Sequence, residues 1–251
     1  MNIIINGAKG RMGRMLADMI AERSGEFRAA ARVDSAYAPD EGPDAWMTLD
    51  AYQGPADVLV DFTHHTATQA VLDYCLARAL PAVICTTGQT EAERDLIRAA
   101  SGRIPVFFSA NMSIGVALLA DMARKAAAAF PEADIEIIER HHNQKLDVPS
   151  GTALLLARRI CEARGEMKFV LGRSGHAKRE PDEIGIHALR YGGEVGTHEI
   201  IIATGRETIT LKHEAENRAL FAEGALAAAA FLTGKAPGLY DMRDIIRQGE
   251  K

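Results

Sequence analysis

Short apolar runs alternate with helix-like segments through the first half of the chain. The runs are rich in β-branched and aromatic residues and lie at positions 3–5, 27–33, 58–62, 82–85 and 106–108. Between them, apolar residues recur three and four positions apart, as in an amphipathic helix, at 11–22, 67–78 and 91–100. Strands that are apolar throughout are typical of a parallel sheet covered on both faces. The alternation therefore predicts a doubly wound α/β domain with right-handed crossovers.

The second half of the chain has a different pattern. A helical pattern spans 114–130, a strand-like run at 135–138 leads into a polar loop, and a second helix follows at 152–164. Further strands are predicted at 184–190, 198–203 and 207–212, and the turn at 204–206 favours antiparallel pairing of the last two. A closing helix at 219–232 precedes the tail. We therefore predict two domains, α/β and then α+β, that divide near Ser113.

Composition limits the classes of function. The 251 residues are 47% hydrophobic and 25% charged, which is typical of a soluble globular protein. With 29 Lys and Arg against 34 Asp and Glu, the net charge of −5 gives no broad basic surface for nucleic acid or for an anionic membrane. The sequence shows neither a secretory leader pattern nor an apolar stretch of ~18 residues. We expect a cytoplasmic protein that acts on small molecules.

We expect no metal site in this chain. The cysteines form no CxxC pair and are interpreted as small buried hydrophobes (Cys75, Cys85 and Cys161). Two His-Glu pairs begin like the zinc motif HExxH, but neither has a histidine at the fifth position (His198-Glu199 and His213-Glu214).

A glycine-rich segment follows the first predicted strand and opens the first predicted helix: Gly7-Ala8-Lys9-Gly10-Arg11-Met12-Gly13. Glycines at this place let the chain turn tightly and let backbone N–H groups approach a pyrophosphate at the helix N-terminus. Asp34, at the end of the second strand, can accept both ribose hydroxyls of NAD. The context predicts a nicotinamide dinucleotide site, with a tight turn alone as the alternative. The lack of a Gly-Lys-[Ser/Thr] ending excludes a P-loop NTPase.

The sequence leaves both NADH and NADPH open as the cofactor. Asp34 would repel a 2′-phosphate and favours NADH, and the next residue, Ser35, is not basic. Lys9 and Arg11, in contrast, are cations that could meet a 2′-phosphate. We expect NADH to be used at least as well as NADPH.

Residues able to transfer protons or bind anions are most concentrated in the segment 139–153, which contains His141, His142 and Lys145. In an extended stretch the two histidines point to opposite faces, so they are poorly placed to share one metal. A proton-transfer group beside a cation suits an anionic substrate better. Ser150-Gly151-Thr152 predicts a helix start with Ser150 as N-cap, whose free N–H groups would suit a carboxylate. A solvated polar loop before a capped helix is the alternative.

These motifs resemble the dihydrodipicolinate reductase family along nearly the whole chain. The resemblance rests on the glycine loop, on the segments 110–116 and 139–153, and on three shorter strings, Asp61-Phe62-Thr63, Thr86-Thr87-Gly88 and Gly238-Leu239-Tyr240-Asp241-Met242. The string HHxxKxDxPSGTA within 139–153 is the most specific of them. The resemblance implies hydride transfer from NADH or NADPH to a cyclic dicarboxylate, 4-hydroxy-tetrahydrodipicolinate, in the diaminopimelate route to lysine.

The resemblance also implies an architecture and a site. It implies a Rossmann-like cofactor domain of residues 1–113, to which residues 222–251 return. It further implies an α+β substrate domain of residues 114–221, whose open mixed or antiparallel sheet forms a homotetramer. His141 matches the family's acid/base residue and Lys145 its proton donor. The substrate-binding positions are His142, Lys145, Ser150, Gly151 and Thr152. The cofactor-binding positions are Gly7, Ala8, Lys9, Gly10, Arg11, Met12, Asp34, Phe62, Thr63, Cys85, Thr86, Thr87, Ala110, Asn111, Met112 and Ser113.

Three residues depart from the family pattern. Cys85 stands where glycine is common, Val148 replaces an alanine, and Ser35 replaces the basic residue that some members have. Two other functions stay as alternatives. One is another two-domain NAD-dependent dehydrogenase of amino acids or sugars, which the glycine loop fits equally. The other is a non-enzymatic NAD sensor, for which the acidic chain offers no DNA-reading helix.

Overall fold

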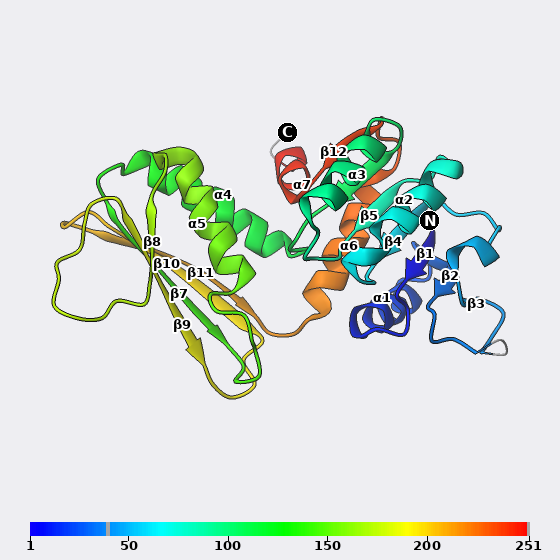
Figure 1. Ribbon diagram of the computed structural model, residues 1–251, viewed down its shortest axis with the longest axis horizontal. Coiled ribbons are helices and arrows are strands. Elements are labelled where there is room, and N and C mark those ends of the chain that lie inside the picture. Colours follow the sequence, from blue (N-terminus) through cyan, green and yellow to red (C-terminus); the bar gives the residue numbers. More distant parts are fainter. Residues whose placement is uncertain (39–40, 250–251) are drawn as a thin grey trace. The chain divides into compact units, whose positions relative to one another are not determined.

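The computed structural model describes residues 1–38 and 41–249, which fall into two units (Figure 1). The first unit is made of Met1–Ile114 and Ala219–Lys251, and the second is Gly115–Arg218. The second unit is therefore an insertion between two segments of the first. Among the described helices, none is both long and apolar enough to span a membrane.

A seven-stranded sheet forms the centre of the first unit. Every neighbouring pair of strands is parallel, and the order is β12-β6-β5-β4-β1-β2-β3. The central strands are almost entirely buried and apolar, which confirms the doubly wound, Rossmann-like prediction. The strands are β1 (Asn2–Asn6), β2 (Arg28–Val33), β3 (Ala45–Trp46), β4 (Val58–Asp61), β5 (Ala82–Ile84), β6 (Pro105–Phe108) and β12 (Gly238–Tyr240).

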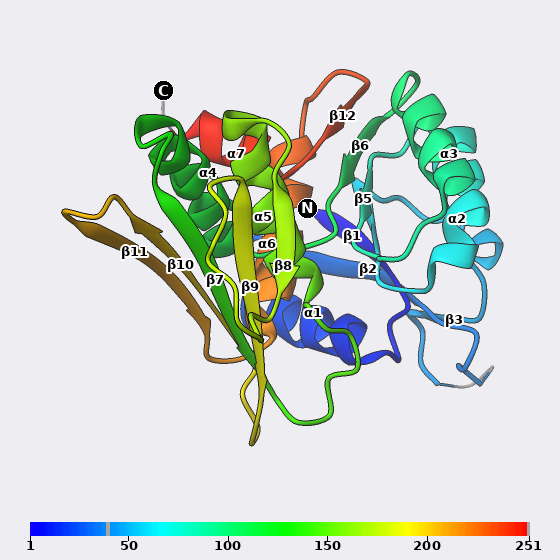
Figure 2. The same cartoon turned by 60° about the vertical axis from the view of Figure 1, so that its left-hand side comes forward.

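Helices cover both faces of this sheet. α2 (Thr68–Ala77) packs with α3 (Glu91–Ser101) on one face, and α1 (Arg11–Glu22) packs with α6 (Ala219–Leu232) on the other (Figures 1 and 2). α7 (Met242–Gln248) follows β12 and begins with a capping box. Two 3₁₀ turns, Leu49–Ala51 and His65–Ala67, complete the unit.

The second unit is a five-stranded mixed sheet with two helices on one face. α4 (Ile114–Ala129) and α5 (Gly151–Arg164) cover that face (Figure 1). Their small apolar residues pack on the inward side chains of the strands, such as Ile135 and Ile137. The order β11-β10-β7-β9-β8 combines parallel pairing of β7, β9 and β8 with antiparallel pairing of β7, β10 and β11. The strands are β7 (Asp134–His141), β8 (Lys168–Leu171), β9 (Glu183–Arg190), β10 (Gly196–Ala203) and β11 (Thr208–Ala215).

The structure corrects the predicted end of the strand at 135–138. β7 continues to His141, and the alternation of buried and half-buried residues persists through its last polar positions. The predicted strand ends early because the last residues of β7 are charged or polar. Hydropathy does not show that such side chains can be buried when they pair with one another. His141 is therefore the last residue of a strand and does not belong to the polar loop.

Candidate functional site

The glycine loop joins β1 to α1 with almost no room for side chains. Gly7 has a φ of +83°, and a Cβ there would lie 2.9 Å from the carbonyl group of Phe62. A Cβ at Gly13 would lie 2.1 Å from the carbonyl oxygen of Gly7. Gly10 is the N-cap of α1, and within the described residues no side chain caps this helix. The first N–H groups of α1 are therefore available to an anion such as a pyrophosphate.

Asp34 follows β2, and its carboxylate fixes the loop. Its two oxygens accept hydrogen bonds from the backbone N–H groups of Lys9, at 2.9 Å, and Ala36, at 3.0 Å. The Lys9 ammonium donates to the Ala36 carbonyl oxygen at 2.9 Å and pairs with Glu41 at 2.7 Å. The charge of Lys9 is therefore already balanced by a carboxylate.

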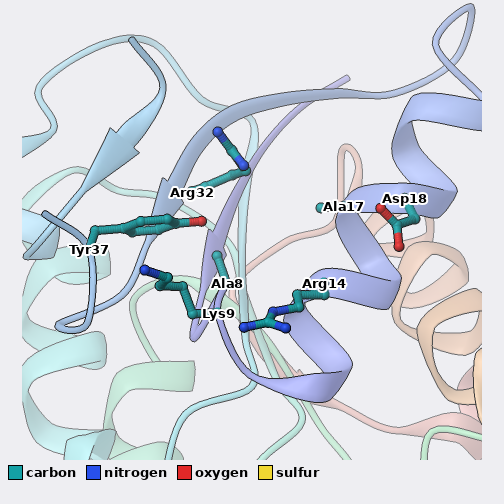
Figure 3. A pocket seen from close by; sticks show the side chains of 7 residues that line it. All are labelled: Ala8, Lys9, Arg14, Ala17, Asp18, Arg32 and Tyr37. Atoms are coloured by element: carbon teal, nitrogen blue, oxygen red, sulfur yellow. The ribbon is translucent and has the colours of Figure 1, made fainter. Parts of the chain in front are cut away.

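A pocket of about 370 Å³ lies beside this loop (Figure 3). The guanidinium of Arg32 makes two hydrogen bonds with Asp44, at 2.8 and 2.7 Å, which raise the pKa of Arg32 and lower the pKa of Asp44. Arg11, which the sequence suggested as a phosphate contact, does not line this pocket, whereas Arg14 does. The lining residues are Ala8, Lys9, Arg14, Ala17, Asp18, Arg32 and Tyr37.

The remaining predicted cofactor positions follow β4, β5 and β6 at the same edge of the sheet. Phe62 N donates to the carbonyl oxygen of Asn6 at 2.9 Å, and Cys85 N donates to that of Asp61 at 3.0 Å. Because the strands are parallel, their carboxyl ends meet at the edge where the glycine loop lies. The positions gathered there are Phe62, Thr63, Cys85, Thr86, Thr87, Ala110, Asn111, Met112 and Ser113.

A buried carboxyl group lies among these strand ends. Asp61 is 1% exposed and accepts hydrogen bonds from the Asn6 amide and the Thr63 hydroxyl, both at 2.8 Å. Burial raises the pKa of Asp61 to about 6, although the hydrogen bonds from Thr63 and Asn6 act in the opposite direction. In the sequence, Asp61 is recognisable only as part of the string Asp61-Phe62-Thr63. In the structure it ties the ends of β1 and β4 to Thr63.

The candidate functional side chains of the second unit lie where β7 and β9 end, beside the beginnings of β10 and α5. His141 lies on the helix-covered face of the sheet and is 8% exposed. Lys145, in the loop after β7, pairs with Asp147 at 2.7 Å. Ser150 is the N-cap of α5, as predicted, and its hydroxyl accepts from Ala153 N at 3.1 Å. The structure therefore places the predicted imidazole, ammonium and helix start in one unit.

His142 has hydrogen-bond partners of its own, which differ from those of His141. Its N–H donates to the carbonyl oxygen of Glu194 at 2.7 Å, and its Nε2 accepts from Arg218 at 3.3 Å. Desolvation and the charge of Arg218 lower the pKa of His142, which favours the neutral imidazole. Arg218 was not predicted, because it is 76 residues away in the sequence.

Three further residues of the cluster were not predicted: Glu139, Arg190 and His198. Glu139 is fully buried, accepts from His141 and pairs with Arg190 at 2.8 Å. Burial would raise the pKa of Glu139, but hydrogen bonds from His141, Arg190 and Ser150 N–H outweigh it and lower the pKa to about 2. Period-two alternation from Ile137 could have placed Glu139 beside His141.

The second unit therefore combines a buried imidazole held by a carboxylate with a lysine and a capped helix start. Such a set can transfer a proton and bind an anion. Within residues 1–38 and 41–249, no group of three His, Cys, Asp or Glu side chains could hold a metal ion.

Comparison with known proteins covers almost the whole chain. Residues 1–112 match the family model described as dihydrodipicolinate reductase, N-terminus, and residues 115–246 match the model for its C-terminus. A 4-hydroxy-tetrahydrodipicolinate reductase of Caldanaerobacter subterraneus subsp. tengcongensis is 42% identical in an alignment of 249 residues that covers 98% of this chain and 98% of its own. The enzyme of the same name from Gluconacetobacter diazotrophicus is 40% identical and covers 96% of this chain and 95% of its own.

Solved structures show the same similarity. A dipicolinate-bound dihydrodipicolinate reductase from Paenisporosarcina sp. TG-14 is 26% identical, with a TM-score of 0.78 over 96% of this chain and 97% of its own. A myo-inositol dehydrogenase from Corynebacterium glutamicum, 16% identical, has a TM-score of 0.60 over 95% of this chain and 90% of its own, and shares the fold alone.

Proposed function

This chain belongs to the dihydrodipicolinate reductase family, and we propose that it uses His141 and Lys145 as the proton-transfer groups of that family's reaction. It is an NAD(P)H-dependent oxidoreductase that reduces 4-hydroxy-tetrahydrodipicolinate in the diaminopimelate route to lysine. The observation that supports the assignment of roles is the buried imidazole of His141, which Glu139 holds in place.

The substrate is a cyclic dicarboxylate, and the start of α5 suits its carboxylate groups. In the structure, the carboxylate of Asp147 pairs with the Lys145 ammonium, and hydrogen bonds from Lys145 and from Gly151 N–H help to lower the pKa of Asp147 against its partial burial. These groups therefore already bind one carboxylate, which is 58% exposed and can be displaced. With no acidic residue in the first turn of α5, Lys145 and the helix N–H groups would neutralise the substrate and polarise its ring.

The residues of the first unit suit a dinucleotide. The uncapped start of α1 would hold the pyrophosphate, and the Asp34 carboxylate, fixed by Lys9 N–H and Ala36 N–H, would accept the ribose hydroxyls. The tight approach of Gly7 and Gly13 to backbone atoms fits a loop that brings the chain close to a ligand. The bound nicotinamide supplies the hydride.

We expect NADH to support turnover at least as well as NADPH. Among the described residues around the pocket of Figure 3, three cations are matched by four carboxylates: Lys9, Arg14 and Arg32 against Asp18, Asp34, Glu41 and Asp44. Such a balance gives little attraction for a 2′-phosphate. The test is kcat/KM for both nucleotides, with substrate generated from pyruvate and aspartate semialdehyde. A value about tenfold or more higher for NADPH, ~1.4 kcal/mol in favour of the phosphate, would contradict the role of Asp34.

We also propose a homotetramer formed through the sheet of the second unit. α4 and α5 cover one face of this sheet, and the other face carries the half-buried Ile138 and Ile201 and the exposed Leu189. Burial of such apolar residues against further copies of the chain would stabilise an assembly. Light scattering at assay concentration should give four times the chain mass of 27.1 kDa, and a monomer mass would refute this proposal.

A further inference from the structure

The carboxylate of Glu139 has all of its acceptor positions filled. Oε2 accepts from His141 Nδ1 at 2.5 Å and from Arg190 Nη1 at 2.8 Å. Oε1 accepts from Arg190 Nη2 at 2.8 Å and from Ser150 N at 3.0 Å. An ionised carboxylate only accepts, so Nδ1 of His141 must carry a proton. The remaining ring nitrogen, Nε2, is the atom that can gain or lose one.

On the opposite edge of the His141 ring, Nε2 lies next to Gly196. This glycine begins β10, and a Cβ placed on it would lie 2.9 Å from His141 Nε2. Any side chain at this position would therefore crowd Nε2. The structure thus pairs Nδ1 with the buried Glu139, whereas a residue without a side chain, Gly196, lies next to Nε2.

His198 packs on His141 without competing for its proton. The two rings meet edge to face, with centroids 5.2 Å apart. The Ser150 hydroxyl accepts from Ala153 N and shares a second hydrogen bond with His198 Nε2, at 3.0 Å, so His198 has its own partner. Burial, and then the charge of His141, lower the pKa of His198 to about 3, so it is neutral at working pH. His198 is therefore a neutral ring that packs against the His141 ring.

We propose that Glu139 is a positioning residue that holds the Nδ1 proton of His141, so that Nε2 alone exchanges a proton with the substrate. During that exchange the Nε2–H bond breaks or forms, Nδ1 keeps its proton, and Glu139 stays ionised and stabilises the imidazolium. Arg190 fixes Glu139 in this position. Through Ser150 N–H, the same carboxylate orients the start of α5, where the substrate carboxylate is proposed to bind. The inference rests on the proposed catalytic role of His141.

The negative charge of Glu139 lies beside several positive and neutral groups around His141. Removal of its charge should therefore make protonated His141 less stable and move the pH dependence of turnover to lower pH. The titratable or charged groups that face His141 or its immediate neighbours are Glu139, Arg190, His198, His142, Lys145, His213 and Arg218.

The test is Glu139→Gln. We expect kcat to fall about 10²-fold with little change in KM. In the pH profile of kcat, the limb that reflects protonation of His141 should move to lower pH by about one unit or more. The matched control is Glu93→Gln, because Glu93 also pairs with a histidine, His65, at 2.9 Å, and glutamine preserves its capping box. This control should change neither kcat nor the profile. An unshifted profile in Glu139→Gln would overturn the proposal.

A double-mutant cycle separates positioning from general loss of structure. If Glu139 acts through His141, adding Glu139→Gln to His141→Gln should cause no further loss of kcat, whereas independent effects would multiply. A multiplied loss would therefore overturn the proposal. If His141→Gln alone leaves turnover unchanged, the proposed function of His141 fails first, and the two failures are thereby distinguished.

The unmodified protein provides a test that no folding defect can obscure. Nitrogen-15 NMR of the histidines, with His141→Gln to assign the signal, should show neutral His141 as the Nδ1-protonated tautomer. His141 found with its proton on Nε2 and a bare Nδ1 would overturn the proposal.

Discussion

Replacing His141 with glutamine should lower kcat by about 10²–10⁴-fold, because general acid–base catalysis contributes about that factor. NADH affinity should stay nearly unchanged, since His141 lies in the second unit and the proposed nucleotide loop lies in the first. Glutamine has an amide N–H that can still donate to the buried Glu139, so the loss should come from chemistry. Steady-state kinetics and fluorescence titration of NADH measure the two quantities.

Two companion variants separate the roles within this site. Lys145→Ala should also lower kcat, because it removes the second proposed proton-transfer group. Thr152→Val, in the first turn of α5, should raise KM and leave kcat nearly intact, since it alters only the proposed carboxylate site. If both His141→Gln and Lys145→Ala leave turnover unchanged, the assigned roles are wrong.

Gly13→Ala should weaken NADH binding by about 10–10²-fold, the effect of ~1–3 kcal/mol of overpacking. The added Cβ would lie 2.1 Å from the Gly7 carbonyl oxygen and 2.7 Å from the Cα of Ala8. Both are backbone atoms, so the loop itself must move. That movement would displace the N–H groups of α1 that are proposed to hold the pyrophosphate.

Gly25→Ala is the matched control for this variant. A Cβ at Gly25 has no neighbour within 4 Å, so the substitution should leave NADH affinity unchanged. Nucleotide titration and thermal unfolding of both variants give the comparison. Wild-type affinity in Gly13→Ala would show that the loop does not hold the cofactor in the proposed way.

The elements that could be predicted are those with a strong local signal. α1 begins and ends at the predicted residues, because the glycine loop precedes it and its apolar positions recur at helical spacing. β3, with only Ala45 and Trp46, is too short to have a period, and the edge strands β8 and β12 are little longer. These three strands were missed because their pairing depends on a neighbour that is distant in sequence.

The same distinction holds for the candidate site. His141, Lys145 and Ser150 lie within one continuous motif, so their proximity could be predicted without a structure. Arg190 and His198 come from β9 and β10, and only the pairing of those strands with β7 brings them to His141. No local pattern indicates that the half-buried Arg190 would pair with the fully buried Glu139, because charged residues are usually exposed.

The insertion of the second unit into the first sets an order for folding during synthesis. All strands and helices of the second unit lie between Ile114 and Ala215, so it can be completed while the first unit still lacks α6 and β12. Until α6 is made, the apolar face of α1 has no helix to pack against. A nascent chain therefore possesses its proposed proton-transfer residues before its nucleotide fold is finished, and the apolar face of α1 stays uncovered by α6 until synthesis nears its end.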